Sequence, residues 1–203
     1  PGYTINIIAE SKLIHNHPQL LQQSASKLDK TIVRAISTFP LHAQPEFEGI
    51  KYFIFSGDES RKGGRRGGQW YFRQGNSISD RFDNAIVVRS AKDYLERYSE
   101  KRALMTAVHE LSHAYYYYHW KKIYRSVNKA YKNAVEQGRY RDVKTKNGKI
   151  IEKAYALTNE REYFAELSKM IHVGNYYHPF DGSELREYDP EGYQAVRLAF
   201  GYQ

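Results

Sequence analysis

The sequence His109-Glu110-Leu111-Ser112-His113 combines two imidazoles and a carboxylate at a spacing that suits metal chemistry. In an α-helix, residues four positions apart lie on one face, so the side chains of His109 and His113 can bind one ion together. Glu110 lies about a third of a turn away from His109, which leaves its carboxylate free to accept a proton from a water molecule. The spacing therefore predicts a catalytic zinc site in which Glu110 is the general base.

The residues around this motif favour a helix. Good helix formers precede it from Arg102 to Val108, and neither Pro nor Gly occurs between residues 90 and 137. Apolar residues recur at helical spacing and predict a buried stripe, which consists of Leu104, Val108, Leu111, Tyr115 and Tyr118. The histidines flank this stripe. The alternative to a metal site is therefore a helix at the edge of the core whose histidines only form hydrogen bonds.

A catalytic zinc usually has three protein ligands, so the rest of the sequence must supply one more. A cap at Thr158 or Asn159 would start a second helix that carries Glu162 and Glu166 on one flank. Like charges at this spacing repel by roughly 0.2–0.5 kcal/mol in a free helix, and a nearby Zn²⁺ would turn that repulsion into attraction. An acidic surface helix, offset by Lys169 and other basic neighbours, is the alternative.

The segment from Tyr155 to Glu166 is similar to the zinc-site region of the anthrax lethal-factor type metallopeptidase domain. It resembles still more closely a family of uncharacterised bacterial and fungal predicted metallopeptidases with the pattern Ala-Leu-Thr-Asn-x-x-Glu-Tyr-Phe-Ala-Glu-Leu-Ser. In that family three further motifs follow, and they occur here as Pro179-Phe180-Asp181, Glu184-Leu185 and Asp189-Pro190-Glu191-Gly192. The resemblance covers about residues 85 to 200.

This resemblance implies roles for individual residues. The implied zinc ligands are His109, His113 and Glu162, and Glu110 would be the general base. Tyr155 would direct its hydroxyl into the site, and Glu166 would orient a ligand histidine from behind. An acidic third ligand is typical of gluzincins, and no His-x-x-Gly-x-x-His extension follows the motif, which argues against a metzincin. The implied activity is that of a zinc-dependent endopeptidase acting on a peptide or protein substrate.

The order of predicted elements indicates an α+β fold. Alternating apolar residues predict strands at Tyr3–Ala9, Ile50–Phe55, Gln69–Arg73 and Ala85–Arg89. Helical periodicity predicts helices at Pro18–Thr38 and Ile123–Glu136, and a helical segment that opens at Ser90 or Asp93 leads into the metal helix. Asn147-Gly148 predicts a hairpin between residues 140 and 155, whose second strand would lead to Tyr155.

The resemblance makes this fold more specific. It implies a zincin-like domain with a small mixed sheet, an edge strand packed on the metal helix, and a second helix that carries the Glu ligand. In such folds the edge strand pairs with an extended substrate, and Ala85–Val88 is the candidate for that strand. An ordinary core strand is the alternative at this position.

Length and composition suit one domain over residues 1–203, because 41% hydrophobic and 15% aromatic residues can fill a sizeable core. No apolar run approaches the ~18 residues that cross a bilayer, so we expect no membrane span. The absence of Cys excludes disulfides and thiolate zinc sites. The chain begins at Pro1 rather than Met, which is compatible with a removed leader or tag. We expect a secreted or periplasmic protein, without excluding the cytoplasm, and the sequence does not indicate an oligomeric state.

The net charge of +8 raises a second class of function. Part of this charge lies in the Gly-rich segment Arg61–Tyr71, where basic residues precede Trp70 and could track a phosphate backbone while aromatic rings stack on bases. The rival to an enzyme is therefore a basic, metal-stabilised module that binds nucleic acid or another polyanion without hydrolysis. No recognised nucleic-acid motif occurs, and a basic loop between strands, at Gly57–Gly68, is the commoner explanation. We therefore do not expect nucleic acid as a partner.

Other polar residues have simpler explanations. Asp181 and Asp189 are expected to cap helices that begin near Ser183 and Pro190. His15 and His17 precede a helix that starts near Pro18, which predicts a turn rather than a metal pair. The four consecutive tyrosines at 115–118 point to every side of their helix, so some of the rings must lie in the core.

Overall fold

The computed structural model describes residues 5–57 and 68–202 of the chain. The chain divides into two compact units, residues 1–114 and 115–203, and the boundary falls within a single helix, α4 (Glu100–Tyr118). Whether the two units unfold together, as one domain over residues 1–203 would, stays a prediction.

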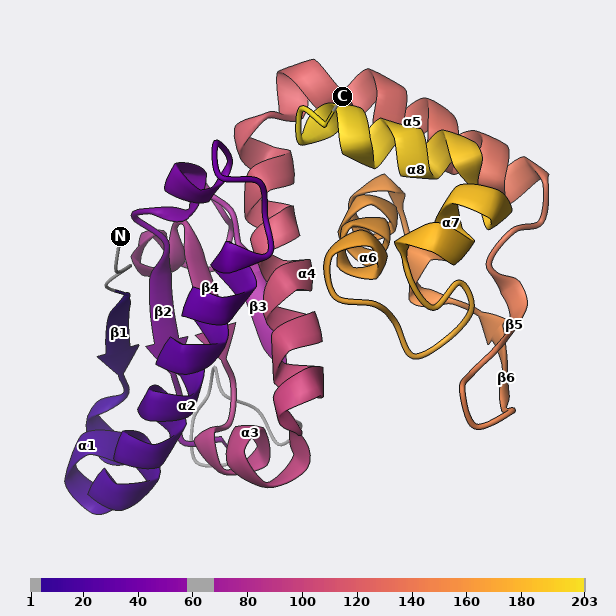
Figure 1. Ribbon diagram of the computed structural model, residues 1–203. Helices are drawn as coiled ribbons and strands as arrows, with labels where there is room; N and C mark the ends of the chain where they lie inside the picture. Colours follow the sequence, from indigo (N-terminus) through magenta and orange to yellow (C-terminus); the bar gives the residue numbers. More distant parts are fainter. Residues whose placement is uncertain (1–4, 58–67, 203) are drawn as a thin grey trace. The chain divides into compact units, whose positions relative to one another are not determined.

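Among the described residues of the first unit, short strands form one sheet (Figure 1). They are β1 (Asn6–Ala9), β2 (Lys51–Ile54), β3 (Gln69–Phe72) and β4 (Ala85–Val88). Their order is β1-β2-β4-β3, in which β1, β2 and β4 run parallel and β3 runs antiparallel to β4. The predicted strands and the small mixed sheet are confirmed, although the start of the first predicted strand, Tyr3 and Thr4, lies outside the described residues.

The expected edge position of Ala85–Val88 is wrong. This strand, β4, pairs with β2 on one side and with β3 on the other, and all of its side chains are buried. A short apolar run without alternating polar residues is typical of a strand that is covered on both faces. The edge of the sheet on this side is formed by β3 instead.

Helices α1 (Ser11–Asn16), α2 (Pro18–Ser37) and α3 (Ala91–Arg97) belong to the same unit. As predicted, α2 begins at a Pro, whose fixed φ suits the first helical turn, and it packs against α3 and β2. Ser90 caps α3 by accepting a hydrogen bond from the backbone N–H of Asp93. On one face of the sheet, Phe53, Phe55 and Val87 form a buried cluster with Phe82.

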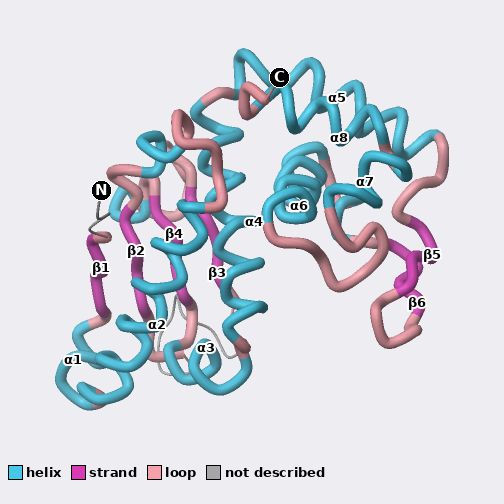
Figure 2. Tube along the Cα trace, in the orientation of Figure 1, coloured by secondary structure: helices cyan, strands magenta, loops and turns pink. Residues whose placement is uncertain are grey.

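The second unit is mainly helical, with one hairpin (Figure 2). Its helices are α5 (Trp120–Glu136), α6 (Glu160–His172), α7 (Gly182–Tyr188) and α8 (Pro190–Ala199). Helix α6 packs against each of the other three, and α5 packs along α8. The central position of α6 explains why every residue from Tyr163 to Met170 is buried.

The predicted hairpin is confirmed as β5 (Arg141–Lys144) paired antiparallel with β6 (Ile150–Lys153). Its turn requires a left-handed residue, and Gly148 adopts φ +82° there. The predicted caps are also confirmed. Asp181 accepts hydrogen bonds from the N–H groups at the start of α7, and Asp189 does the same for α8.

The stripe predicted along α4 is correct except at its end. Leu104, Val108, Leu111 and Tyr115 are buried, but the side chain of Tyr118 is 39% exposed. None of the helices in the described part of the chain is both long and apolar enough to cross a bilayer.

The elements of the two units place the protein in the α+β class, with a small mixed sheet as predicted.

Candidate metal centre

Helix α4 brings His109 and His113 together as their spacing predicts. Their Nε2 atoms lie 3.1 Å apart, with ring planes at 85° to each other. Two zinc–nitrogen bonds of about 2.0–2.1 Å at a tetrahedral angle would separate the nitrogens by ~3.3 Å. The two imidazoles therefore fit a single zinc ion with little rearrangement, and both are buried, with 8% and 9% of their surface exposed.

Glu162 is the third candidate ligand. One ligand atom from each of His109, His113 and Glu162 lies within 4.8 Å of the other two. Asn159 caps α6 and accepts hydrogen bonds of 3.0 Å from the N–H groups of Arg161 and Glu162, which fixes the turn that carries this carboxylate. The three residues could hold a metal ion, and a set of two imidazoles and one carboxylate suits zinc.

Among residues 5–57 and 68–202, no other cluster of three or more His, Asp or Glu side chains has this geometry. His15 and His17 are therefore not part of such a cluster, and His17 instead occupies the position just before α2, as predicted.

Glu110 is held by the edge strand of the sheet. Its Oε2 atom accepts a hydrogen bond of 2.8 Å from the backbone N–H of Tyr71 in β3, and its side chain is only 7% exposed. The Tyr71 hydroxyl donates to Oδ1 of Asn84 at 3.1 Å, which anchors this residue of the strand in turn. Sequence reasoning missed the contribution of Tyr71, because a backbone N–H carries no residue-type signal.

Glu166 lies in a buried network within the second unit. Its Oε1 atom accepts from the Lys169 ammonium at 2.6 Å, and its Oε2 atom accepts from the Tyr177 hydroxyl. Burial, followed by the charge of Glu166, raises the pKa of Tyr177 well above its ordinary value, so this phenol remains a donor. Orientation of a ligand histidine by Glu166 stays a prediction.

Two residues of this network differ from what the sequence indicated. In the alternative to a metal site, Lys169 would offset an acidic surface helix, but it is 8% exposed and forms a buried ion pair with Glu166. Tyr177 was not identified as part of any network. Helical periodicity relates Glu166 only to other residues of α6. Tyr177 lies beyond the end of that helix, where periodicity gives no information.

Tyr155 lies at the start of the short helical turn Tyr155–Leu157, two residues after β6 ends. More than half of its side chain, 54%, is exposed. A residue that meets a substrate needs this kind of access, and the role of its hydroxyl stays a prediction.

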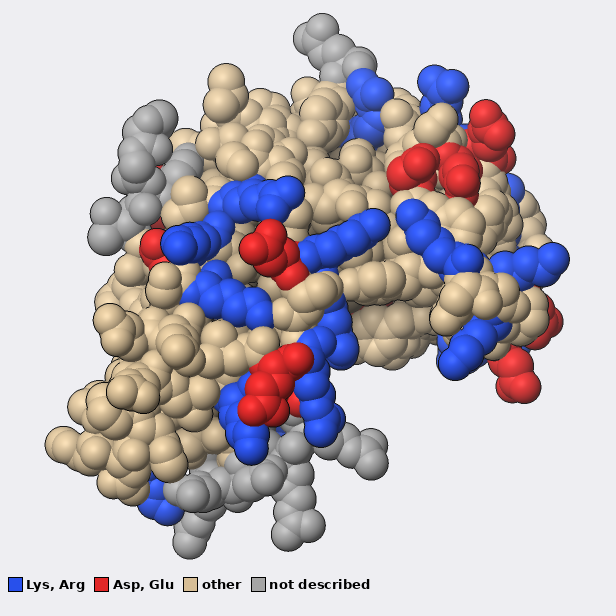
Figure 3. Space-filling view, turned by 60° about the horizontal axis from the view of Figure 1, so that its bottom comes forward, with Lys and Arg blue, Asp and Glu red and all other residues tan. Residues whose placement is uncertain are grey.

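The basic Gly-rich segment falls largely outside the described residues, which resume at Gly68. Of its aromatic residues, Trp70 is 52% exposed and lies under the Arg89 guanidinium, 4.2 Å from the ring centroid. On the face of the molecule in Figure 3, acidic side chains lie among the Lys and Arg side chains.

No protein-family model matches this chain, and no curated protein shows significant similarity to it. What the protein does must therefore be inferred from its own residues and their geometry.

Proposed function

We propose that this protein is a zinc-dependent endopeptidase with a zincin-like catalytic domain. The observation that carries the proposal is the grouping of His109, His113 and Glu162, whose ligand atoms lie within 4.8 Å of one another. A buried carboxylate, Glu110, follows the first of these histidines directly on α4. Two imidazoles, one carboxylate ligand and an adjacent base form one of the sets that support metal-assisted hydrolysis of a peptide bond.

Each residue has a distinct role in this proposal. Zinc, when bound, would polarise the substrate carbonyl and lower the pKa of a water molecule toward about 7. Glu110, positioned by the Tyr71 N–H, would accept a proton from the attacking water and deliver it to the leaving amine. Tyr155 would donate a hydrogen bond to the carbonyl oxygen as it gains charge. Glu166 would orient a ligand imidazole through its second nitrogen.

We also propose that an extended substrate adds as a strand to β3. This strand forms an edge of the sheet, and one of its backbone N–H groups reaches Glu110 at 2.8 Å. A peptide paired with β3 would therefore run beside the proposed base, with main-chain hydrogen bonds giving affinity for any sequence. This assignment replaces β4, whose two edges are already paired.

The central test is the Glu110→Gln variant, which removes the base but keeps the size of the side chain. We expect it to bind one equivalent of zinc. In a peptide-library digest it should be roughly 10²–10⁴-fold less active than the unsubstituted protein. Glu136→Gln, an exposed substitution on α5, is the matched control and should keep full activity. Retained turnover in Glu110→Gln would refute the role of this residue as base.

A second test concerns the metal itself. Glu162→Ala should cut the bound metal to well below one equivalent, whereas Glu160→Ala, in the same turn of α6, should not change it. Two His and one carboxylate also form the iron site of some oxygenases, so the metal must be identified by mass spectrometry. Protein that selects iron over zinc and digests no peptide when loaded with either metal would overturn the proposal.

The rival function, a basic binding module, predicts salt-sensitive retention on DNA that survives substitution of His109 and Glu110. Absence of retention at moderate salt would remove this alternative. Substitution of His109 and Glu110 thus distinguishes an enzyme from a basic binding module.

A further inference from the structure

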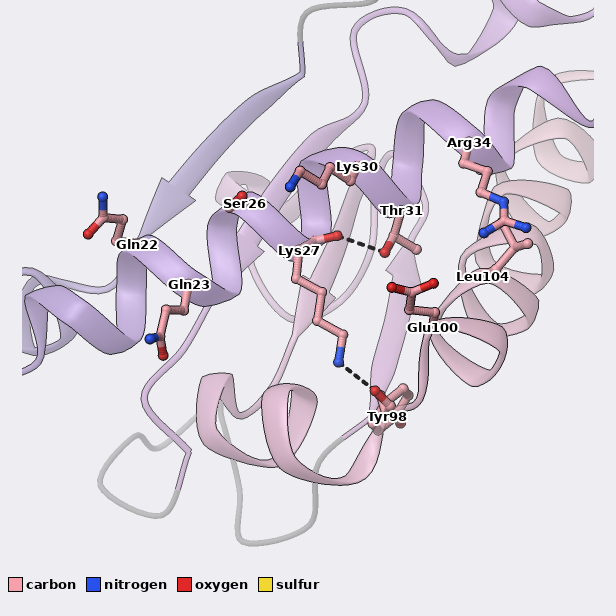
Figure 4. Close-up of a pocket in the computed structure, with 10 residues that line it drawn as sticks. All are labelled: Gln22, Gln23, Ser26, Lys27, Lys30, Thr31, Arg34, Tyr98, Glu100 and Leu104. Atoms are coloured by element: carbon pink, nitrogen blue, oxygen red, sulfur yellow. Dashed lines mark hydrogen bonds between the residues drawn. The ribbon is translucent and has the colours of Figure 1, made fainter.

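A groove of about 840 Å³ lies in the first unit, between α2 and the segment that joins α3 to α4 (Figure 4). None of its lining residues belongs to the candidate metal centre. The lining residues are Gln22, Gln23, Ser26, Lys27, Lys30, Thr31, Arg34, Tyr98, Glu100 and Leu104.

Three cations line one side of this groove. Lys27, Lys30 and Arg34 follow one another at spacings of three and four residues, which places them on the same face of α2. None of the ion pairs between described residues includes any of these three side chains. Like charges at these spacings repel each other, and an anion bound in the groove would turn this repulsion into attraction.

Lys27 occupies a fixed position in the groove. Its ammonium donates a hydrogen bond to the carbonyl oxygen of Tyr94 at 2.8 Å. It also donates to the carbonyl oxygen of Tyr98 at 2.5 Å, at the end of α3 (Figure 4). Carbonyl groups hold the ammonium without neutralising its charge. Burial lowers the pKa of Lys27, partly offset by Glu100, so a nearby anion would stabilise the charged form of this lysine.

Lys30 and Arg34 are exposed and remain available to a ligand. In Figure 4 the Arg34 side chain extends from α2 toward Leu104 at the start of α4. Its planar guanidinium can bind a carboxylate or a phosphate group through two parallel hydrogen bonds. Glu100 is the one acidic residue among those that line the groove, so three positive charges face one negative charge.

The far end of the groove has a different character. Gln22, Gln23 and Ser26 supply amide and hydroxyl groups but no charge. From Gln22 to Arg34 the helix rises by ~18 Å at about 1.5 Å per residue. A matching ligand would therefore be charged at one end, and would carry uncharged hydrogen-bonding groups at the other.

We propose that this groove binds a small polyanion, whose phosphate or carboxylate groups meet Lys27, Lys30 and Arg34 and whose hydroxyl or amide groups meet Gln22, Gln23 and Ser26. The site is independent of the proposed peptidase function, because neither the metal ligands nor Glu110 take part. It would also persist in protein from which metal has been removed.

Titration of ¹⁵N-labelled, metal-free protein by NMR tests this site, at constant ionic strength. Pyrophosphate and tricarballylate serve as separate probes, and the tighter of the two identifies the preferred group. We expect saturable shifts at backbone amides of residues 26–34 and 98–104. Lys30→Gln combined with Arg34→Gln should weaken binding at least about tenfold, whereas Glu100→Gln, which removes the opposing charge, should strengthen it about threefold.

The control combines Lys129→Gln with Lys132→Gln on α5, two exposed lysines whose loss changes net charge equally. This control should leave the affinity unchanged. Equal weakening by the control, unchanged affinity without Lys30 and Arg34, or no saturable shift with either anion at millimolar concentration would each overturn the proposal. Amide spectra of every variant show whether the fold is intact, and the Glu100→Gln gain cannot result from unfolding.

Discussion

Among its described residues, the first unit buries apolar side chains and, apart from the metal motif, only uncharged polar ones, whereas the second unit also buries charged groups. Asp189, Glu166 and Lys169 are respectively 0%, 3% and 8% exposed, and all three lie in the second unit. Two units of one chain can therefore rely on different interactions for their stability. The first gains stability mainly from apolar area, and the second also needs buried charges to keep their partners.

Asp189 shows how the second unit keeps a buried charge hydrogen-bonded. Its Oδ1 atom accepts from Arg139 at 2.8 Å and from the N–H of Gly192 at 3.0 Å. Its Oδ2 atom accepts from the hydroxyls of Tyr140 at 2.9 Å and Tyr163 at 2.5 Å. One carboxylate thereby caps α8, neutralises a cation and joins α6 to the segment before β5. A buried charge with four donors is fully satisfied, and its removal leaves all four without their acceptor.

The largest effect in the second unit should follow from Asp189→Ala. We expect a loss of about 3–5 kcal/mol in the free energy of unfolding, because the partly buried Arg139 would lose its counter-charge and the buried donors around Asp189 would lose their acceptor. Urea denaturation followed by circular dichroism measures this. Asp181→Ala also removes a helix cap, but from an exposed residue, and should cost only about 1 kcal/mol. Equal losses for the two variants would show that Asp189 acts as a cap alone.

In the first unit, the comparable test is Leu28→Ala on α2, where the side chain is fully buried. The cavity should lower the free energy of unfolding by about 2–4 kcal/mol. Because this loss has no electrostatic part, it should be the same at low and high salt, whereas the loss from Asp189→Ala should change slightly, because salt screens a buried pair much less than an exposed one. A salt-dependent loss for Leu28→Ala would break the contrast between the two units.

Close packing around Asp189 predicts a smaller effect for Gly192→Ala. A Cβ atom at this position would lie 2.2 Å from the Tyr163 hydroxyl and 2.6 Å from Oδ2 of Asp189. Overpacking should cost about 1–3 kcal/mol, despite the better helix propensity of Ala. Gly182→Ala, whose added Cβ would lie 3.3 Å from Cα of Ile171, is the control and should cost clearly less in the same urea measurement. If both variants are neutral, the segment around Asp189 can relax and is not rigid.

Alkaline pH should lower the stability of the two units to different extents, with a smaller effect than the substitutions above. Burial raises the pKa of Tyr94 in the first unit to about 12, and in the second unit burial and Asp189 raise the pKa of Tyr140 and Tyr163 further. A raised pKa means that stability is complete below the unfolded value near 10 and is lost as pH rises toward the folded value. Each such tyrosine adds a slope of up to about 1.4 kcal/mol per pH unit above pH 10.

Measurements of unfolding between pH 8 and about 11.5 test this expectation, with hydrogen exchange to assign the loss to each unit. The second unit should lose stability faster, and Tyr163→Phe should flatten its curve. A curve that is identical in both units, or that Tyr163→Phe leaves unchanged, would contradict the assignment.

Several parts of the fold could be predicted because their causes are local. Asn147-Gly148 fixes a hairpin turn through the backbone freedom of Gly148, and Asp181 and Asp189 cap helices whose first N–H groups are only two or three residues away. The strands and the α+β class followed from alternation and from the order of elements, whereas the small mixed sheet was implied by the family resemblance. The position of Ala85–Val88 within the sheet could not be predicted in this way. A short apolar run suits an interior strand, and it also suits an edge strand whose faces are covered by other elements.

The sequence alone determined that His109, Glu110 and His113 share one helix with the imidazoles on a common face, because a period of 3.6 residues is a local property of the chain. It also determined that Glu162 stands in the first turn of a capped helix. Only the tertiary structure decided that the β3 backbone holds Glu110, that Lys169 is a buried partner of Glu166, and that one carboxylate, Asp189, joins residues from three segments. These contacts depend on which distant parts of the chain pack together, and no local pattern of residues encodes that.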